Sequence, residues 1–149
     1  MRLFTHFVFG AGSVAALAFT LPVDLRLSLA VATSLLVNLV VDELGHVARG
    51  GFAVRSPLTH SVFTAPMWGG AVGYVLWVVG SELGLLSPGP EAMLVVLCVV
   101  VAYSHLLLDS MTEGGVYFTT RRIAVSHFSN GNVLLNAAFV LCGLALFLL

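Results

Sequence analysis

Two short motifs of mirrored order carry the residues best suited to chemistry in this sequence. One is Asp42–His46 (DELGH) and the other is His105–Asp109 (HLLLD). Residues four apart lie about one turn apart on an α-helix, so each motif should present an imidazole and a carboxylate on one face. Because only 9% of the residues are charged, two such pairs at the ends of apolar segments indicate two halves of one site.

Further histidines extend this candidate site. His6 and His60 each follow a threonine and begin an apolar segment. Mixed imidazole and carboxylate ligands suit zinc or manganese better than calcium. Six ligands exceed the needs of one tetrahedral ion, so one ion, or two ions about 3.5–4 Å apart, would fit. The expected metal ligands are His6, Asp42, His46, His60, His105 and Asp109.

Other polar residues are candidates for catalysis and substrate binding. Glu43 and Glu113 are candidate general bases, and Arg55 is the candidate for neutralising a phosphate. Arg55–Ser61 (RSPLTHS) also places an arginine beside an expected helix N-terminus, where an anion could bind. A simple helix cap, and arginines that meet lipid headgroups, explain the same features. The expected substrate-binding residues are Arg55, Thr59, Ser61, Arg121, Arg122 and His127.

Two asparagines in apolar segments have a structural interpretation. Ser34, Asn38 and Asp42 follow one another at intervals of four and form one polar stripe on a helix. Asn38 and Asn136 are therefore expected to make hydrogen bonds between helices, as polar residues in membrane bundles do.

The composition indicates the fold class. With 59% hydrophobic residues among 149 and a mean hydropathy of +1.06, the chain is more apolar than a soluble domain. A helix needs about 20 apolar residues to cross a bilayer. The sequence thus predicts a single all-α integral membrane domain over 1–149, with polar connections at 45–60 and 111–131. The five expected transmembrane segments are 7–21, 26–44, 61–80, 91–110 and 132–149.

A weak internal repeat divides these segments. Thr5–Ala11 matches Thr59–Ala65 at five of seven positions. Each copy opens a helix, and the helix that follows ends in one of the two Asp/His motifs. This pattern predicts two repeated helical hairpins plus one further helix, with the hairpins parallel to each other.

Arginine placement predicts the orientation in the membrane. All six basic residues are arginine, and only Arg26 falls on the far side of the five-span arrangement. The positive-inside rule then places the N-terminus in the cytoplasm and the C-terminus outside, in a multi-pass protein of the cell membrane. All five histidines fall at the cytoplasmic level. The net charge of −1 provides no basic surface for nucleic acid, and the oligomeric state stays open.

Two segments resemble a known family. Arg55–Ser61 and Tyr103–Val116 (YSHLLLDSMTEGGV) are similar to motifs of the membrane-bound metal-dependent hydrolases, whose bacterial members are described as LexA-binding, inner-membrane-associated hydrolases. The similarity to the uncharacterised archaeal branch covers most of the chain, including Asp42–His46 and Ser126–Phe128. It implies metal dependence and hydrolysis without a defined substrate. The family commonly carries glycine after the arginine, where Ser56-Pro57 stands here, so this loop should differ.

The sequence therefore predicts a membrane-embedded metal-dependent hydrolase with a cytoplasm-facing His/Asp site. Its expected substrate is a phosphate ester of a lipid or another amphiphile, and its expected partners are this small molecule and the bilayer. Two other functions fit the same residues. One is a metal or proton transporter, although the far side offers few polar groups beyond Asn136 and Glu82. The other is a non-catalytic membrane adaptor whose Asp/His network only fixes the helix packing.

Overall fold

The computed structural model describes residues 1–49, 52–86, 89 and 91–149, and these residues are mostly helical. All five apolar segments expected from the sequence contain a helix. The helices are α1 (Leu3–Leu17), α2 (Val23–Gly45), α3 (Pro57–His60), α4 (Ala65–Glu82), α5 (Glu91–Ser110) and α6 (Val133–Leu146). The strands are β1 (His46–Arg49), β2 (Phe52–Arg55), β3 (Val116–Phe118) and β4 (Arg121–Ile123).

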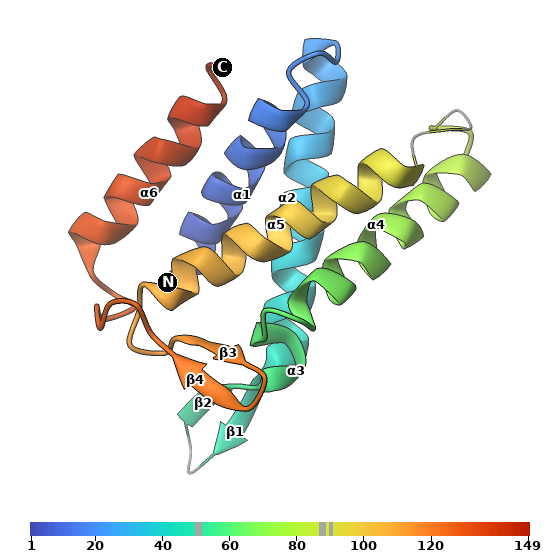
Figure 1. Ribbon diagram of the computed structural model, residues 1–149. Helices are drawn as coiled ribbons and strands as arrows, with labels where there is room; N and C mark the ends of the chain where they lie inside the picture. The colour runs from blue at the N-terminus through green and yellow to red at the C-terminus, as the bar shows by residue number, and fades with distance from the viewer. Residues whose placement is uncertain (50–51, 87–88, 90) are drawn as a thin grey trace.

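Helix α5 forms the centre of the fold, packed against α1, α2 and α4 (Figure 1). Its side chains Cys98, Val101 and Ala102 are fully buried, and Glu91 in the first turn complements the positive end of the helix dipole. Helix α6 packs on the outer side of α1. Because α5 is enclosed by three neighbours, polar side chains at its C-terminal end must find partners within the protein.

Glycines let the helices approach closely. Gly69 and Gly73 lie four residues apart on α4 and face α5, where a side chain would not fit. A Cβ atom at Gly73 would lie 2.7 Å from the Cα atom of Val95. Gly143 of α6 meets α1 in the same way, with a Cβ position 2.6 Å from the carbonyl oxygen of Val8. Small residues spaced four apart are a common means of packing apolar helices whose backbones touch.

Two short antiparallel hairpins occupy the polar connections that the sequence predicts at 45–60 and 111–131. In the first hairpin His46 lies opposite Arg55, and in the second Tyr117 lies opposite Arg122. A parallel bridge joins Ser61 to Tyr117. The hairpins lie at the same end of the helices as the N-terminus and the C-terminal end of α5 (Figure 1). The fold is thus helical with a small β element, which the all-α expectation did not include.

The lengths of the helices bear on the membrane prediction. Among the described residues, α2 and α5 are long and apolar enough to cross a bilayer, whereas α1 and α6 are apolar but shorter. Core helices of soluble proteins can have the same length and composition. Two such helices are weak evidence of membrane association, and the five-span arrangement is not confirmed.

Candidate metal centre

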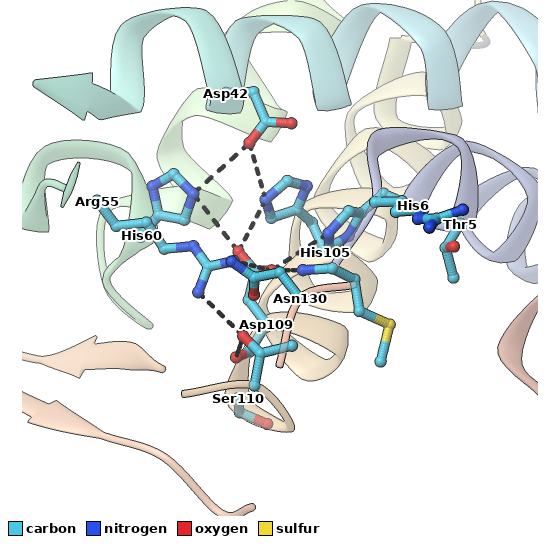
Figure 2. A network of polar contacts seen from close by, with 12 residues as sticks. Thr5, His6, Asp42, Arg55, His60, His105, Asp109, Ser110 and Asn130 are labelled. Atoms are coloured by element: carbon cyan, nitrogen blue, oxygen red, sulfur yellow. Dashed lines mark hydrogen bonds and ion pairs between the residues drawn. The ribbon is translucent and has the colours of Figure 1, made fainter. Parts of the chain in front are cut away.

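Four potential ligand atoms converge near the C-terminal end of α5 (Figure 2). Nε2 of His105 lies 3.5 Å from Oδ1 of Asp42 and 3.2 Å from Oδ2 of Asp109. Nε2 of His60 lies 3.8 Å and 3.5 Å from the same two oxygens. Ligands about 2.0–2.1 Å from a tetrahedral zinc ion lie about 3.3 Å from one another. Asp42, His60 and His105 place ligand atoms within 4.8 Å of one another, and Oδ2 of Asp109 lies close to both histidines. This tetrad (Asp42, His60, His105 and Asp109) could therefore hold one divalent ion.

Hydrogen bonds orient both imidazoles of the tetrad. Nδ1 of His105 lies 2.7 Å from Oδ1 of Asn38, whose Nδ2 donates to the carbonyl oxygen of Ser34 over 2.8 Å. Since this amide oxygen can only accept, the proton of His105 belongs on Nδ1 and the lone pair on Nε2. Nδ1 of His60 lies 2.9 Å from the hydroxyl of Thr59, which can accept a hydrogen bond from it. Such partners on the second nitrogen are typical of metal-binding histidines.

Three of the four converging atoms have no other partner. Within the described part of the chain, His60 Nε2, His105 Nε2 and Asp109 Oδ2 are buried without a hydrogen bond. A buried polar atom left in this state costs about 1–3 kcal/mol. Burial also lowers the pKa of His60, which favours the neutral imidazole that binds metals. One cation at the shared point would satisfy all three atoms, so the donor set fits a metal.

The other oxygen of Asp109 is held by cationic groups and a histidine. Oδ1 accepts a hydrogen bond of 2.6 Å from Nη2 of Arg55 and one of 3.0 Å from the amino group of Met1. Nε2 of His6 lies 3.2 Å away. Nη1 of Arg55 also donates to the hydroxyl of Thr112 over 3.2 Å. Asp109 is therefore fixed through Oδ1 while Oδ2 faces the tetrad.

His6 belongs to a second, overlapping group. Its ring stacks on that of His105 with centroids 4.0 Å apart, and His6, His105 and Asp109 place ligand atoms within 4.8 Å of one another. Both groups need Nε2 of His105, because its Nδ1 is bonded to Asn38. One nitrogen lone pair binds one ion, so the two groups cannot be filled together. Of the one or two ions that the sequence allows, this geometry favours one.

The remaining expected ligand, His46, lies outside both groups. Helix α2 ends at Gly45, and His46 has the extended backbone of the first residue of β1, with φ −100° and ψ 122°. Its Nδ1 forms a hydrogen bond of 2.8 Å with the backbone carbonyl of Asp42. The ring packs edge-on against His60 with centroids 5.3 Å apart. His46 is thus a neighbour of the tetrad rather than a member.

The two candidate general bases are not brought to the tetrad. The side chains of Glu43 and Glu113 are exposed, and neither belongs to the groups whose ligand atoms converge. Glu43 lies on the outer side of α2, next to the inward-facing Asp42. Glu113 follows α5 in the polar connection, where its backbone N–H donates to the carbonyl of Phe128 over 2.9 Å.

The expected substrate-binding residues separate into three sets. Arg55 and Arg122 line a polar cavity beside the tetrad. Thr59 and Ser61 are buried and serve local structure, since the hydroxyl of Ser61 accepts from the backbone N–H of Phe63. Arg121 and His127 are exposed and lie outside the lining of the cavity.

The sequence did not identify three residues of this region as functional. Asn38 was expected to join helices, and the spacing of Ser34, Asn38 and Asp42 was the available signal that it shares a face with the site. Tyr117 and Asn130 line the cavity. Tyr117 reaches it because the second hairpin folds back toward Arg55, and Asn130 lies in the segment between that hairpin and α6. No sequence spacing indicates either placement.

The fold and the site define a mostly helical protein with a buried His/Asp cluster at one end of its helices. The chain belongs to the family described as "Protein of unknown function (DUF1286)", which matches residues 1–108. No curated protein and no solved structure matches the chain. The matched part contains Asp42, His60 and His105, and Asp109 follows it directly.

Proposed function

We propose that the protein is a membrane-embedded metal-dependent hydrolase that binds one divalent transition ion, zinc or manganese, at the tetrad. The substrate would be a phosphate ester of a lipid or another amphiphile. The observation that carries this proposal is the convergence of two imidazole nitrogens and two carboxylate oxygens, of which three atoms have no other partner. The resemblance to membrane-bound metal-dependent hydrolases supports the same class of activity.

The number of ligands bears on catalysis. A divalent ion polarises a phosphoryl oxygen and lowers the pKa of water to about 7. Four protein ligands close a tetrahedral zinc site, as in structural sites, whereas an octahedral manganese ion retains open positions. Asp42 is the most exposed of the four, with 22% of its side chain accessible. A catalytic ion held by these four residues would need either a coordination number above four or a weak bond to Asp42.

The protein's own side chains have defined tasks in this reaction. Arg55 fixes the orientation of Asp109 through Oδ1, and Asn38 fixes that of His105. Arg55 also lines the neighbouring cavity, where its guanidinium would stabilise the charge of a phosphate.

A lipid environment is supported by the outer helix faces. Large apolar side chains such as Met67 and Tyr74 of α4, and Leu134 and Leu141 of α6, are exposed. Soluble monomers rarely expose continuous apolar patches of more than a few hundred Å². Arg55, Arg121 and Arg122 lie at the end that carries the tetrad, in agreement with a cytoplasmic site.

The test combines metal content with activity. The purified protein in detergent should contain about one transition ion per chain by elemental analysis and hydrolyse a phosphomonoester such as phosphatidic acid. His105→Ala and Asp109→Ala should lose the metal and the activity together. His127→Ala is the matched control, because this histidine is exposed and lies outside both ligand groups.

Other results would replace the proposal. A protein that binds no transition metal and keeps its fold in both tetrad variants would be better described as an adaptor with a structural polar network. Metal-dependent ion flux in liposomes, without hydrolysis, would instead indicate transport.

A further inference from the structure

A polar cavity of about 170 Å³ lies next to the tetrad. Its polar lining consists of His46, Arg55, Tyr117, Arg122 and Asn130. Arg55 connects the two sites, since its Nη2 bonds to Asp109 (Figure 2) and the residue also lines the cavity. An ordered water needs about 10–15 Å³ of such space. The cavity is therefore large enough for a small polyatomic group.

The second hairpin determines which arginine faces this cavity. Tyr117 and Arg122 are direct partners across β3 and β4, so their side chains share one face of the hairpin. The hydroxyl of Tyr117 donates to the backbone carbonyl of Arg55 over 3.3 Å, which holds this face against the cavity. Arg121 precedes Arg122 on the strand and must point to the opposite face.

The charge of the cavity is one-sided. It is lined by two arginines, and none of the described residues that line it is acidic. Asp109 partly neutralises the charge of Arg55, whereas the side chain of Arg122 makes no ion pair or hydrogen bond with the part of the chain that the structure describes. Nδ1 of His46 forms a hydrogen bond with the backbone carbonyl of Asp42, so its Nε2 can bind a ligand in the cavity. These groups offer several hydrogen bonds and positive charge to one ligand.

We propose that this cavity is a binding site for a phosphomonoester group. A phosphomonoester carries a charge of about −1.5 to −2 at pH 7 and three terminal acceptor oxygens. The planar fork of arginine matches such oxygens well. The site would accept either a lipid headgroup or free phosphate. As a statement about substrate class the inference rests on the proposed hydrolase, but phosphate binding itself requires no metal.

The experiment compares two adjacent arginines. Binding of inorganic phosphate to the full-length protein in detergent is measured by isothermal titration calorimetry for wild type, Arg122→Ala and Arg121→Ala. Arg122→Ala should weaken binding at least tenfold, and Arg121→Ala, with the same change in charge, should leave it within twofold. Equal binding by the two variants, or no phosphate binding by the wild type, would overturn the proposal. Asn130→Ala is a second variant, expected to weaken binding with the fold intact by circular dichroism.

Further arms identify the ligand and separate the two proposals. Nanodiscs of phosphatidylcholine with or without phosphatidic acid show whether a lipid headgroup occupies the site, in which case phosphatidic acid competes with free phosphate. Acetate that binds as tightly as phosphate would contradict the assigned class. Metal content is measured on the same samples. Phosphate binding without bound metal would support the phosphate site in the cavity and contradict the metal-dependent hydrolase. Bound metal without phosphate binding would contradict the phosphate site and leave the metal-dependent hydrolase supported.

Discussion

The Nδ1–H of His105 donates to Oδ1 of Asn38 over 2.7 Å, and this bond decides which nitrogen of His105 faces the carboxylates. Asn38 is fully buried, and its amide nitrogen is committed to Ser34. The asparagine therefore cannot reverse its role without losing a bond inside α2. Asn38 joins two helices and also fixes the tautomer in which His105 can bind a metal.

Replacing Asn38 should weaken metal binding without removing a ligand. We expect Asn38→Ala to reduce zinc affinity about 10- to 100-fold, because the ring of His105 loses the partner that fixes its tautomer. Competition with a chromophoric chelator measures this change. Ser104→Ala is the control, since Ser104 lies next to His105 on α5 and bonds only to its own helix. Wild-type affinity in Asn38→Ala would show that the bond does not orient the ligand.

Replacing Arg55 should destabilise the protein. Arg55→Met leaves the buried carboxylate of Asp109 without its shortest hydrogen bond. Such a bond to a charged group contributes about 1.5–3 kcal/mol to the free energy of unfolding. Chemical denaturation in detergent measures the loss. Arg55→Lys should recover only part of it, because an ammonium group cannot reproduce the arginine fork. Arg121→Met, at an exposed position, should change little, and an equal loss there would contradict the explanation.

Replacing His6 should distinguish one ion from two. His6 contacts Oδ1 of Asp109 rather than the oxygen that faces the tetrad. We expect His6→Gln to retain about one ion per chain with a moderate loss of affinity, and His60→Ala to lose the ion. Elemental analysis of both variants measures the number of ions per chain. A decrease from two ions to one in His6→Gln would establish a second metal position.

Adding a methyl group at Gly45 should disrupt the site. A Cβ atom there would collide with the Thr59 hydroxyl and lie 2.5 Å from Cε1 of His60. Gly45→Ala should therefore displace His60 and lower metal affinity by more than tenfold in a titration. Gly70→Ala is the matched control, because no atom lies closer than 3.9 Å to its Cβ position. Similar losses in both variants would point to general instability.

The membrane prediction has its own test. If the exposed apolar faces of the helices contact lipid, the protein should stay in the membrane fraction at high salt and alkaline pH and dissolve only in detergent. A reporter at the C-terminus should be accessible outside the cell, as the arginine distribution predicts. Release by salt alone would show that the helices do not insert, and a cytoplasmic reporter would contradict the five-span topology.

The two Asp/His motifs show how far sequence spacing predicts geometry. His105 and Asp109 both lie within α5, so the helical spacing places their ligand atoms 3.2 Å apart as expected. The same spacing also brings Asp42 and His46 near each other, although α2 ends between them. The distance between their side-chain atoms is 3.8 Å, yet His46 binds a backbone carbonyl outside the ligand groups. Helical spacing therefore predicts which side chains approach each other, whereas the end of a helix decides whether both face the same site.

The sequence by itself determined the apolar segments, the clustering of polar residues at one end and the types of ligand, because these depend on local periodicity and composition. The tertiary structure alone decided that His60 and His105 meet Asp42 and Asp109 at one point. It also turned Arg55 toward Asp109 and brought the second hairpin over the cavity. These relationships join residues distant in the chain, and they depend on how closely the backbones pack, which no local pattern contains.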